Sequence, residues 1–441
     1  MKILFPNISQ SDLEYAIECL EVCKQEDAVL YGFHYPYFTP GGAYGKQWWQ
    51  LDSSLALRGY QWIDRDFVER ALWNFIESQK EDGRVCLWGA DLLPEKVAGD
   101  NCLMQTKDVS SLPKLFDVTY HVLQGSSDQT LKHKAYNMLK RYLDWWFSHR
   151  QDKETGLITA VFEETFIPYL GCAGEYAAVD TNVEVYVGCH YTALLARELD
   201  KKQDADELDV KKLQLKQSIN QYLWSEERGA YFPYLIKEKR IYDCLMASTF
   251  YPLRMQIADL DRQKKLLSLM KSDEDFNWSK IPLTSVSMKD PAFVITTGQY
   301  QGNASWSGDV WSLINEMVVR GLCDCGENEL AAELAIKTLS VFNHNCTEFA
   351  NPFDGSGHGV LQYAWTASQY LELLTETVFG VSYRANDKTV IISPKLTKQF
   401  RSELIYIKEL CIANRIFMDI IIDNGRIMYS ISDDSVKVQI L

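Results

Sequence analysis

The chain has 441 residues, a formal net charge of -15, 46% hydrophobic residues and 12% aromatic residues. Because phosphate binding needs clustered Lys and Arg, this charge argues against nucleic acid and anionic membrane surfaces as partners, and it fits a soluble protein with a neutral ligand. Eleven Cys at irregular spacing, without a paired CxxC, predict neither a disulfide framework nor a zinc site. The apolar run in MKILFP is too short for a signal peptide, and no segment reaches the roughly 18 apolar residues of a membrane span, so we expect a cytoplasmic protein.

Two kinds of predicted helix alternate along the chain. Charged, amphipathic helices with one solvated face are expected at about 9–25, 64–79, 128–149, 204–224, 258–271 and 327–342. Helices that are apolar nearly all round, and so must be covered on both sides, are expected at about 52–61, 110–124, 180–198, 245–256, 308–321 and 360–375. Six outer and six inner helices in strict alternation predict a mainly α fold of six helical hairpins that close into an (α/α)6 toroid.

The connections have an equally regular pattern. The links that lead from an outer to an inner helix are long, at about 26–51, 80–109, 150–179, 225–244, 272–307 and 343–359, whereas the return links are short. All the long links should therefore emerge at one end of the toroid. Because loops longer than about 15 residues in a compact domain are usually functional, that end is the candidate active face.

After Gly380 the pattern changes to short β-rich runs. The segment Asp423-Asn424-Gly425 separates two of these runs, and Asn-Gly between such runs is a strong hairpin signal. We therefore expect a toroid domain at 1–379 and a small antiparallel β domain at 380–441.

The sixth long link carries the first candidate for catalysis, Glu348. We expect its carboxylate to lie among Phe349, Phe353 and Trp365, where partial desolvation would keep it poised as a base and the rings would offer faces to a pyranose. His358 and Trp365 are candidates for substrate binding. The alternative for Glu348 is a solvated loop glutamate.

The first, second and fifth long links add candidates for substrate binding. In the first link, Trp49 and Asp52 stand in an aromatic stretch, which suits ring stacking and a carboxylate that holds two hydroxyls; the alternative for Asp52 is a plain helix N-cap. Lys107 in the second link is polar but unspecific. Trp306 and Gly308 belong to the fifth link. With seven His and no HxxxH-like pair, imidazole metal chemistry is not indicated.

Acidic residues are dense in the third long link. Glu163, Glu164 and Glu175 precede Asp180 and lie among apolar residues, unlike a solvated charge run. Asp180 has a plain helix cap as its alternative reading.

At these residues the chain resembles the six-hairpin glycosidases, especially the family 63 glycosidases and the related family 37 trehalases, over most of residues 40–380. Glu348 with Asn351-Pro352 and Gly355 is similar to the E-x-x-N-P-x-x-G stretch that carries the inverting general base. Four further fragments occur along the chain in the same order as in the family. Leu51-Asp52-Ser53 resembles W-D-S/T, and Asp180 with Asn182 resembles V-D-x-N/A. Trp306 to Trp311 resembles W-R-G-x-V-W, and Tyr363 to Ala367 resembles the W-S/T-A helix.

Two positions depart from the family pattern. Ser307 stands where the family has the Arg of W-R-G. The family's general acid lies in an E-S-G-x-D segment, and the corresponding stretch from Glu163 matches the Glu but lacks the Asp. The acid must then be another group, for which we expect Glu164 first, Asp180 next and Glu163 third.

The resemblance implies single-displacement, inverting hydrolysis of an α-linked gluco- or manno-configured small sugar, with Glu348 as the base and with no metal or organic cofactor. Two alternatives remain open. A sugar epimerase or isomerase on the same toroid would need titrating His in the cavity, and His is scarce in the long links. A non-catalytic sugar-binding relative would keep Trp49, Trp306 and Asp52 while lacking an acid.

Overall fold

The computed structural model describes the chain except residues 27–30, 94–107, 162, 167–175 and 296–305. Helical segments lie at all twelve expected positions. The outer ones are α1 (Gln10–Cys23), α3 (Arg65–Glu77), α6 (Gln129–His149), α8 (Lys202–Ser218), α9 (Leu260–Met270) and α12 (Asn328–Phe342). The inner ones are α2 (Gln50–Tyr60), α5 (Leu115–Gln124), α7 (Val179–Glu198), η6 (Ala247–Gln256), α11 (Ser312–Asp324) and α13 (Ala364–Glu372). The chain is therefore mainly α, as predicted.

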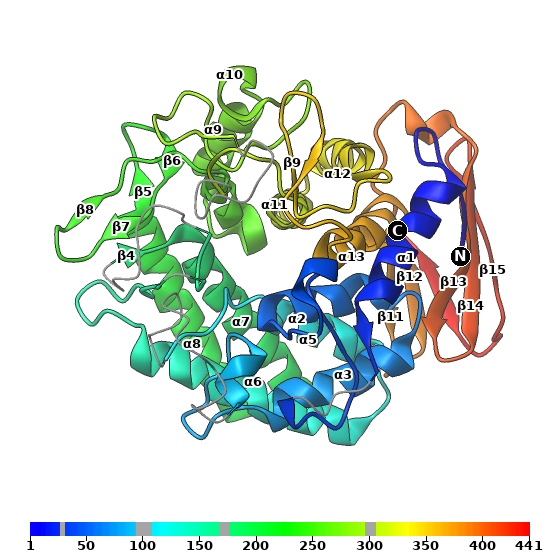
Figure 1. Ribbon diagram of the computed structural model, residues 1–441, viewed down its shortest axis with the longest axis horizontal. Helices are drawn as coiled ribbons and strands as arrows, with labels where there is room; N and C mark the ends of the chain where they lie inside the picture. The colour runs from blue at the N-terminus through cyan, green and yellow to red at the C-terminus, as the bar shows by residue number, and fades with distance from the viewer. Residues whose placement is uncertain (27–30, 94–107, 162, 167–175, 296–305) are drawn as a thin grey trace.

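The inner segments contact one another in chain order. α2 contacts α5, α5 contacts α7, α7 contacts η6, η6 contacts α11, α11 contacts α13, and α13 contacts α2. Every residue of α2 is buried, whereas α3 and α6 bury one face, because only the inner segments are covered on both sides. Figure 1 shows α3, α6 and α8 outside α2, α5 and α7.

Two inner segments differ from their expected form. The segment at 245–256 is the 3-10 helix η6, with Pro252 inside it and non-helical backbone at Arg254 and Met255. Pro252 lacks a backbone N–H, so a regular α-helical pattern of hydrogen bonds cannot run through this segment. The helix expected from residue 110 begins only at Leu115, because Pro113 disfavours helical backbone at the residue before it.

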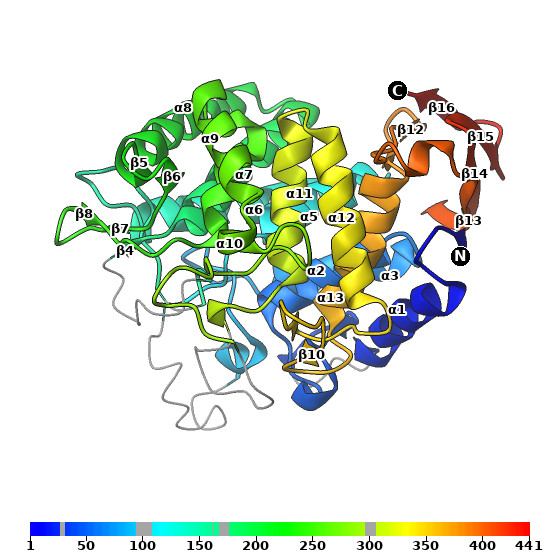
Figure 2. The same cartoon turned by 90° about the horizontal axis from the view of Figure 1, so that it is seen from above.

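Short strands lie in or beside the long links. β2 (Lys24–Gln25) pairs with β3 (Tyr37–Phe38), β4 (Tyr176–Ala177) pairs with β7 (Tyr234–Leu235), which pairs with β8 (Arg240–Ile241), and β9 (Phe349–Ala350) pairs with β10 (Gly357–His358). Figure 2 places the β9–β10 hairpin at the lower edge, which is the face toward the reader in Figure 1. Other short elements are β5 (Trp224–Ser225), β6 (Ala230–Tyr231), η2 (Gly42–Tyr44), η3 (Gly89–Leu92), η5 (Ile219–Leu223), α10 (Asp273–Phe276), η8 (Leu373–Val378) and η9 (Phe400–Ser402).

The C-terminal part forms small sheets beside the helices. One sheet has the antiparallel order β1 (Lys2–Leu4), β13 (Ile405–Ala413), β14 (Ile416–Asp423), β15 (Arg426–Ile431). The other joins β11 (Val381–Arg384), β12 (Thr389–Ile392) and β16 (Lys437–Ile440), and its β12–β16 pair is parallel. The hairpin expected at Asn424-Gly425 is confirmed, with positive φ at both residues. The N-terminal strand thus pairs with the C-terminal part, and the boundary at 379/380 stays a prediction.

A buried cluster of charged side chains lies between the inner segments, and each inner segment contributes to it. Its members are Arg58, Lys114, Asp117, Glu184, Arg254, Glu316, Arg320, Glu372 and Glu376. Lys114 Nζ lies 3.0 Å from Asp117 Oδ2 and 3.4 Å from Glu316 Oε2. Removing one partner of a buried pair typically costs about 3–5 kcal/mol, so loss of a single member of the cluster should destabilise the contacts between the inner segments. In the part of the chain that the structure describes, no helix is long and apolar enough to cross a membrane.

Candidate active site

Glu348 immediately precedes β9, and two hydrogen bonds with Val360 hold it in place. Its N–H donates to the Val360 carbonyl at 2.9 Å, and the Val360 N–H donates to Glu348 Oε2 at 3.3 Å. Gly359 has φ +73, and a Cβ there would stand 2.7 Å from that oxygen, so the close approach needs glycine. Glu348 is 5% exposed, and burial raises its pKa to about 8. It is therefore not a solvated loop glutamate.

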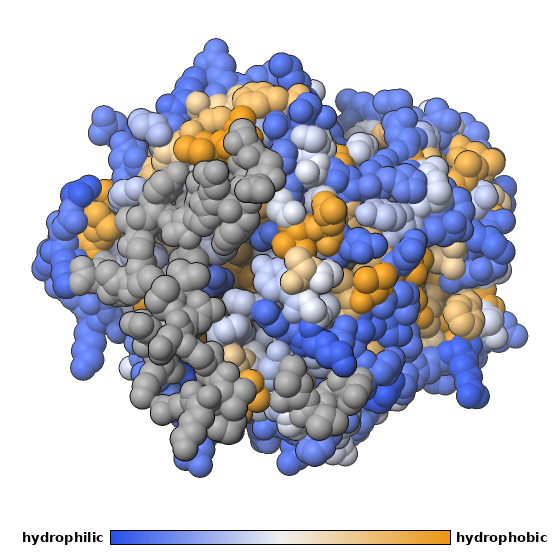
Figure 3. All heavy atoms as spheres, in the orientation of Figure 1, coloured by the Kyte–Doolittle hydropathy of each residue, from blue (hydrophilic) through white to orange (hydrophobic). Residues whose placement is uncertain are grey.

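Aromatic rings surround the start of this hairpin. Phe349 stacks on Trp311 at 5.3 Å, and Trp311 packs against Trp306 and Trp365, each at 5.7 Å. Phe353, which we expected beside Glu348, is 58% exposed instead, because it lies in the hairpin turn. Figure 3 shows this face hollowed near its centre, with apolar side chains next to the hollow.

Asp52 is a buried carboxylate in the first turn of α2. The N-cap of α2 is Trp49, not Asp52, so Asp52 is not a plain helix cap. Its Oδ1 accepts a hydrogen bond of 2.7 Å from the Tyr363 hydroxyl, and burial raises the pKa of Asp52 to about 7. Trp49 packs on Trp88 of the second link at 5.1 Å, at the rim of the same site.

Glu163 brings a third carboxyl to this place. Its side chain is partly buried, and its backbone has φ +71, in the left-handed region. Burial, followed by the charges of Asp52 and Glu348, raises the pKa of Glu163 to about 8. The three carboxyls therefore lie close enough to influence one another, although they come from α2, the third link and the sixth link.

Glu164, the first sequence candidate for the acid, is fully occupied. Arg150 donates to it from Nε at 2.8 Å and from Nη2 at 2.9 Å, and the N–H groups of Ser110 and Val161 donate at 3.0 and 3.2 Å. Each oxygen thus accepts two hydrogen bonds from N–H groups. Because both oxygens of Glu164 already accept hydrogen bonds, its carboxylate is poorly placed to carry a proton and donate it to a substrate. The geometry disfavours the expectation that Glu164 is the acid.

Asp180, the second candidate, is occupied in the same manner. Its carboxylate accepts hydrogen bonds from Thr165 Oγ1 at 2.7 Å, from the Phe166 N–H at 2.8 Å and from the Thr181 N–H at 2.8 Å. It therefore ties the third link to the first turn of α7. This arrangement disfavours Asp180 as a proton donor too.

The remaining sequence candidates lie in different surroundings. Trp306 belongs to the aromatic cluster, and Gly308 is packed so closely that a Cβ would stand 2.4 Å from the Val294 carbonyl oxygen. His358 faces Ser356 of the hairpin turn, at 3.3 Å, rather than the carboxyls. Lys107 lies outside the described residues.

Two contacts that position the site escaped sequence reasoning. Arg150 and the Tyr363 hydroxyl each contact a predicted acid, but their partners are 14 and 311 positions away in the chain. Among the described residues, no group of His, Cys, Asp and Glu could hold a metal ion.

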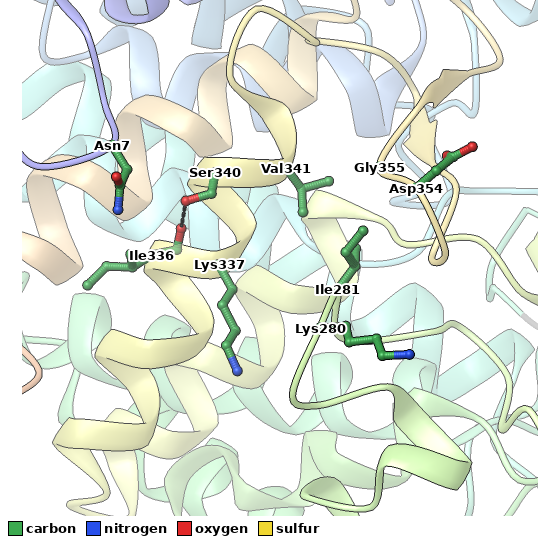
Figure 4. A pocket seen from close by; sticks show the side chains of 9 residues that line it. All are labelled: Asn7, Lys280, Ile281, Ile336, Lys337, Ser340, Val341, Asp354 and Gly355. Atoms are coloured by element: carbon green, nitrogen blue, oxygen red, sulfur yellow. Dashed lines mark hydrogen bonds between the residues drawn. The ribbon is translucent and has the colours of Figure 1, made fainter.

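A separate hollow of about 500 Å³ lies on the outside of the molecule (Figure 4). Its lining residues are Asn7, Lys280, Ile281, Ile336, Lys337, Ser340, Val341, Asp354 and Gly355. None of the three carboxyls lines it, so the two features are distinct.

The helical pairs and the carboxyl cluster together define a chain like the six-hairpin glycosidases. Residues 168–366 match the family described as "Mannosylglycerate hydrolase MGH1-like glycoside hydrolase domain". The resemblance to family 63 and to the trehalases, predicted from the motifs, is confirmed.

Named relatives agree with this class. A mannosylglycerate hydrolase from Rubrobacter radiotolerans is 27% identical over 188 residues, which cover 42% of this chain and 40% of that protein. A periplasmic trehalase from Escherichia coli is 24% identical over 126 residues, 29% of this chain and 20% of that protein. The matches thus span less than half of the length of these relatives. The crystal structure of a family 63 mannosylglycerate hydrolase from Thermus thermophilus, in complex with glucose, superposes with a TM-score of 0.67 at 19% identity, over 82% of this chain and 99% of that one; this likeness concerns the fold.

Proposed function

We propose that this chain hydrolyses a glycosidic bond in one displacement that inverts the anomeric configuration, with Glu348 as general base and Glu163 as general acid. The observation that carries the proposal is the meeting of Asp52, Glu163 and Glu348 beside a cluster of aromatic rings. Carboxyl pairs flanking a sugar ring are what such hydrolysis needs. The sequence of contacts around the inner segments supports the further proposal that the fold is a closed (α/α)6 toroid with this site at its mouth.

The surroundings of the two glutamates differ in a way that assigns their roles. The Val360 N–H donates to Glu348, and a donated hydrogen bond stabilises a carboxylate. Among the described residues, none donates to the carboxyl of Glu163, and burial together with the charges of Asp52 and Glu348 opposes its ionisation. Burial raises the pKa of both glutamates to about 8, so the assignment of roles depends on this hydrogen bond. We assign the base to Glu348, whose carboxylate accepts it, and the acid to Glu163.

The reaction then proceeds as follows. The proton of Glu163 passes to the glycosidic oxygen while the bond from the anomeric carbon to that oxygen breaks. On the opposite face a water molecule bonds to the anomeric carbon and gives its proton to Glu348. The products are two sugars, or a sugar and an alcohol, and the proton on Glu348 returns to solvent.

The names of the relatives support a small substrate. We propose an α-linked gluco- or manno-configured sugar, stacked on the aromatic cluster and held through two hydroxyls by Asp52. The location in the cytoplasm is part of this proposal.

A panel of α- and β-linked disaccharides and glycosyl-glycerates, with product analysis by NMR, tests the function. Release of a monosaccharide from one of them, lost in Glu348→Gln, is the expected result. Binding of a monosaccharide in calorimetry without turnover of any glycoside would instead identify a sugar-binding protein. Conversion of one sugar into another without bond cleavage would identify an epimerase or isomerase.

A further inference from the structure

We propose that Glu164 and Asp180 are positioning residues: they hold Glu163 in its left-handed backbone conformation and so aim its carboxyl into the site. This inference rests on the proposed role of Glu163 as the acid. Glu164 and Asp180 would then act by positioning Glu163, without touching the substrate themselves.

The backbone of Glu163 needs such support. A non-glycine residue at φ +71 is in a sparsely populated region, and it stays there only when its surroundings hold it. The Leu112 N–H donates to the Glu163 carbonyl at 2.9 Å, and the Glu164 N–H donates to the Val161 carbonyl at 3.1 Å. These two bonds fix both ends of the peptide group that follows the strained residue.

The Glu164 side chain closes the turn around Glu163. One of its oxygens accepts from the Val161 N–H, two positions before Glu163, while the other accepts from the Ser110 N–H of the second link. Arg150 bridges both oxygens, and its guanidinium lies 4.8 Å from the ring of Trp145, which fixes the cation itself. The turn is therefore tied to α6 and to the neighbouring link.

The Asp180 side chain fixes the residues that follow. It binds Thr165 Oγ1 and the Phe166 N–H, and the next residue along α7, Thr181, donates from Oγ1 to the Glu164 carbonyl at 2.7 Å. Phe166 in turn packs on Trp311 at 5.6 Å. Three consecutive residues after Glu163 are thus anchored to α7, so a change in the backbone conformation of Glu163 would break several buried hydrogen bonds.

A double-mutant cycle tests the inference with two substrates. One is a glycoside with a poor leaving group, and the other is the corresponding glycosyl fluoride, from which fluoride departs without being protonated. Glu164→Gln should lower kcat/KM roughly 100-fold on the poor leaving group and little on the fluoride, because a misplaced acid is missed only where protonation is needed. The double variant with Glu163→Gln should be no slower than Glu163→Gln alone. Thr181→Val, which removes one anchor at nearly constant shape, should give a smaller loss of the same kind. Asp66→Asn, which breaks an exposed ion pair with Arg70, is the control and should keep full activity.

Multiplied losses in the double variant, or an equal loss on the fluoride, would show a general structural role and overturn the inference. A mild loss in Glu163→Gln beside a large one in Glu164→Gln would make Glu164 itself the acid, with the same consequence.

A readout independent of activity separates this inference from the proposed function. In a carbon-13 NMR titration, the Glu163 carboxyl, identified by its absence in Glu163→Gln, should titrate near pH 8 in the parent protein, because burial raises its pKa to about 8. In Glu164→Gln or Thr181→Val that pKa should fall toward 4.5, the ordinary value, as the carboxyl turns to solvent. An unchanged pKa would refute the positioning role. A fallen pKa in a protein that cleaves no glycoside would keep the positioning role and refute the proposed function.

Discussion

The hydroxyl of Tyr363 donates a 2.7 Å hydrogen bond to Oδ1 of Asp52, which joins the end of the sixth long link to the first turn of α2. This bond stabilises the ionised form of Asp52 and so opposes the effect of burial on the pKa of that carboxyl. Burial raises the pKa of Glu348, and the charge of Asp52 raises it further. Tyr363 thus influences the proposed base through an intermediate carboxylate.

The first prediction concerns pH dependence. A general base must be ionised and a general acid protonated, so kcat/KM should rise with pH as Glu348 loses its proton and fall as Glu163 loses its own; burial raises both pKa values to about 8. Asp52→Asn removes a negative charge that raises the pKa of Glu348, so the rising limb should move to lower pH. Tyr363→Phe makes Asp52 harder to ionise and should move the limb the same way by less. Profiles of kcat/KM against pH check this, and a limb that stays or moves to higher pH would contradict the coupling.

The second prediction separates the two glutamates. Glu348→Gln should keep the fold and sugar binding but lose roughly 10²- to 10⁴-fold in rate on every substrate, since the amide cannot accept the proton of water. Glu163→Gln should lose as much on poor leaving groups and recover on glycosyl fluorides. Steady-state rates on both substrate types decide the matter, and a near-normal rate in Glu348→Gln would exclude it as the base.

The third prediction is stereochemical. An inverting site holds its carboxyls about 6.5–9.5 Å apart, leaving room for water, whereas a retaining pair is about 5–5.5 Å apart. Because acid and base come from the third and sixth long links, we expect the first anomer released to be opposite to that of the substrate. Proton NMR before mutarotation measures it; a retained anomer, or a covalent adduct on Glu348, would overturn the mechanism.

The fourth prediction uses a matched pair of glycines. Gly359→Ala should lower kcat roughly 100-fold, because the new Cβ would stand 2.7 Å from Glu348 Oε2 and displace the carboxylate. Gly326 has a similar φ of +80, but nothing lies within 4 Å of the position that a Cβ would take there, so Gly326→Ala carries the same backbone strain without the clash. Both variants should melt earlier than the parent in a thermal scan, yet only the first should lose activity. Equal activities would show that the contact with Glu348 is unimportant.

The fifth prediction concerns stability. Burial raises the pKa of Glu184 to about 7 and that of Glu372 to about 8 in the charged cluster. Each folded carboxyl then retains a proton that the unfolded chain releases, so stability is greatest below the unfolded pKa and is lost as pH rises toward the folded one. Between about pH 5 and 7 each such group removes up to about 1.4 kcal/mol per pH unit.

Urea unfolding at several pH values measures this slope. Glu372→Gln carries no titrating proton, so its slope over the same range should be shallower than that of the parent protein, whatever its absolute stability. A slope equal to that of the parent would show that Glu372 is ionised throughout.

Much of the fold could be predicted from local patterns. The alternation of charged and apolar helices, the long links and the hairpin at Asn424-Gly425 depend on periodicity and turn chemistry, which neighbouring residues express by themselves. The 3-10 form of the segment around Pro252 could not be predicted in this way, because an apolar run does not reveal whether its backbone hydrogen bonds follow an α or a 3-10 pattern.

The sequence by itself determined which links carry carboxyls and aromatic rings, and it singled out Glu348, Asp52 and the acids of the third link. Only the tertiary structure decided which of those acids faces the site. The sequence ranked Glu164 before Asp180 and Glu163 as the acid, because each is an acid beside apolar residues and only its place in the link set it apart. Their roles diverge through partners such as Arg150 and Thr165, and through a positive φ at Glu163 that no local pattern announces. The sequence states which residues are acids. Whether an acid can donate a proton depends on which hydrogen-bond donors contact its carboxyl in the folded chain.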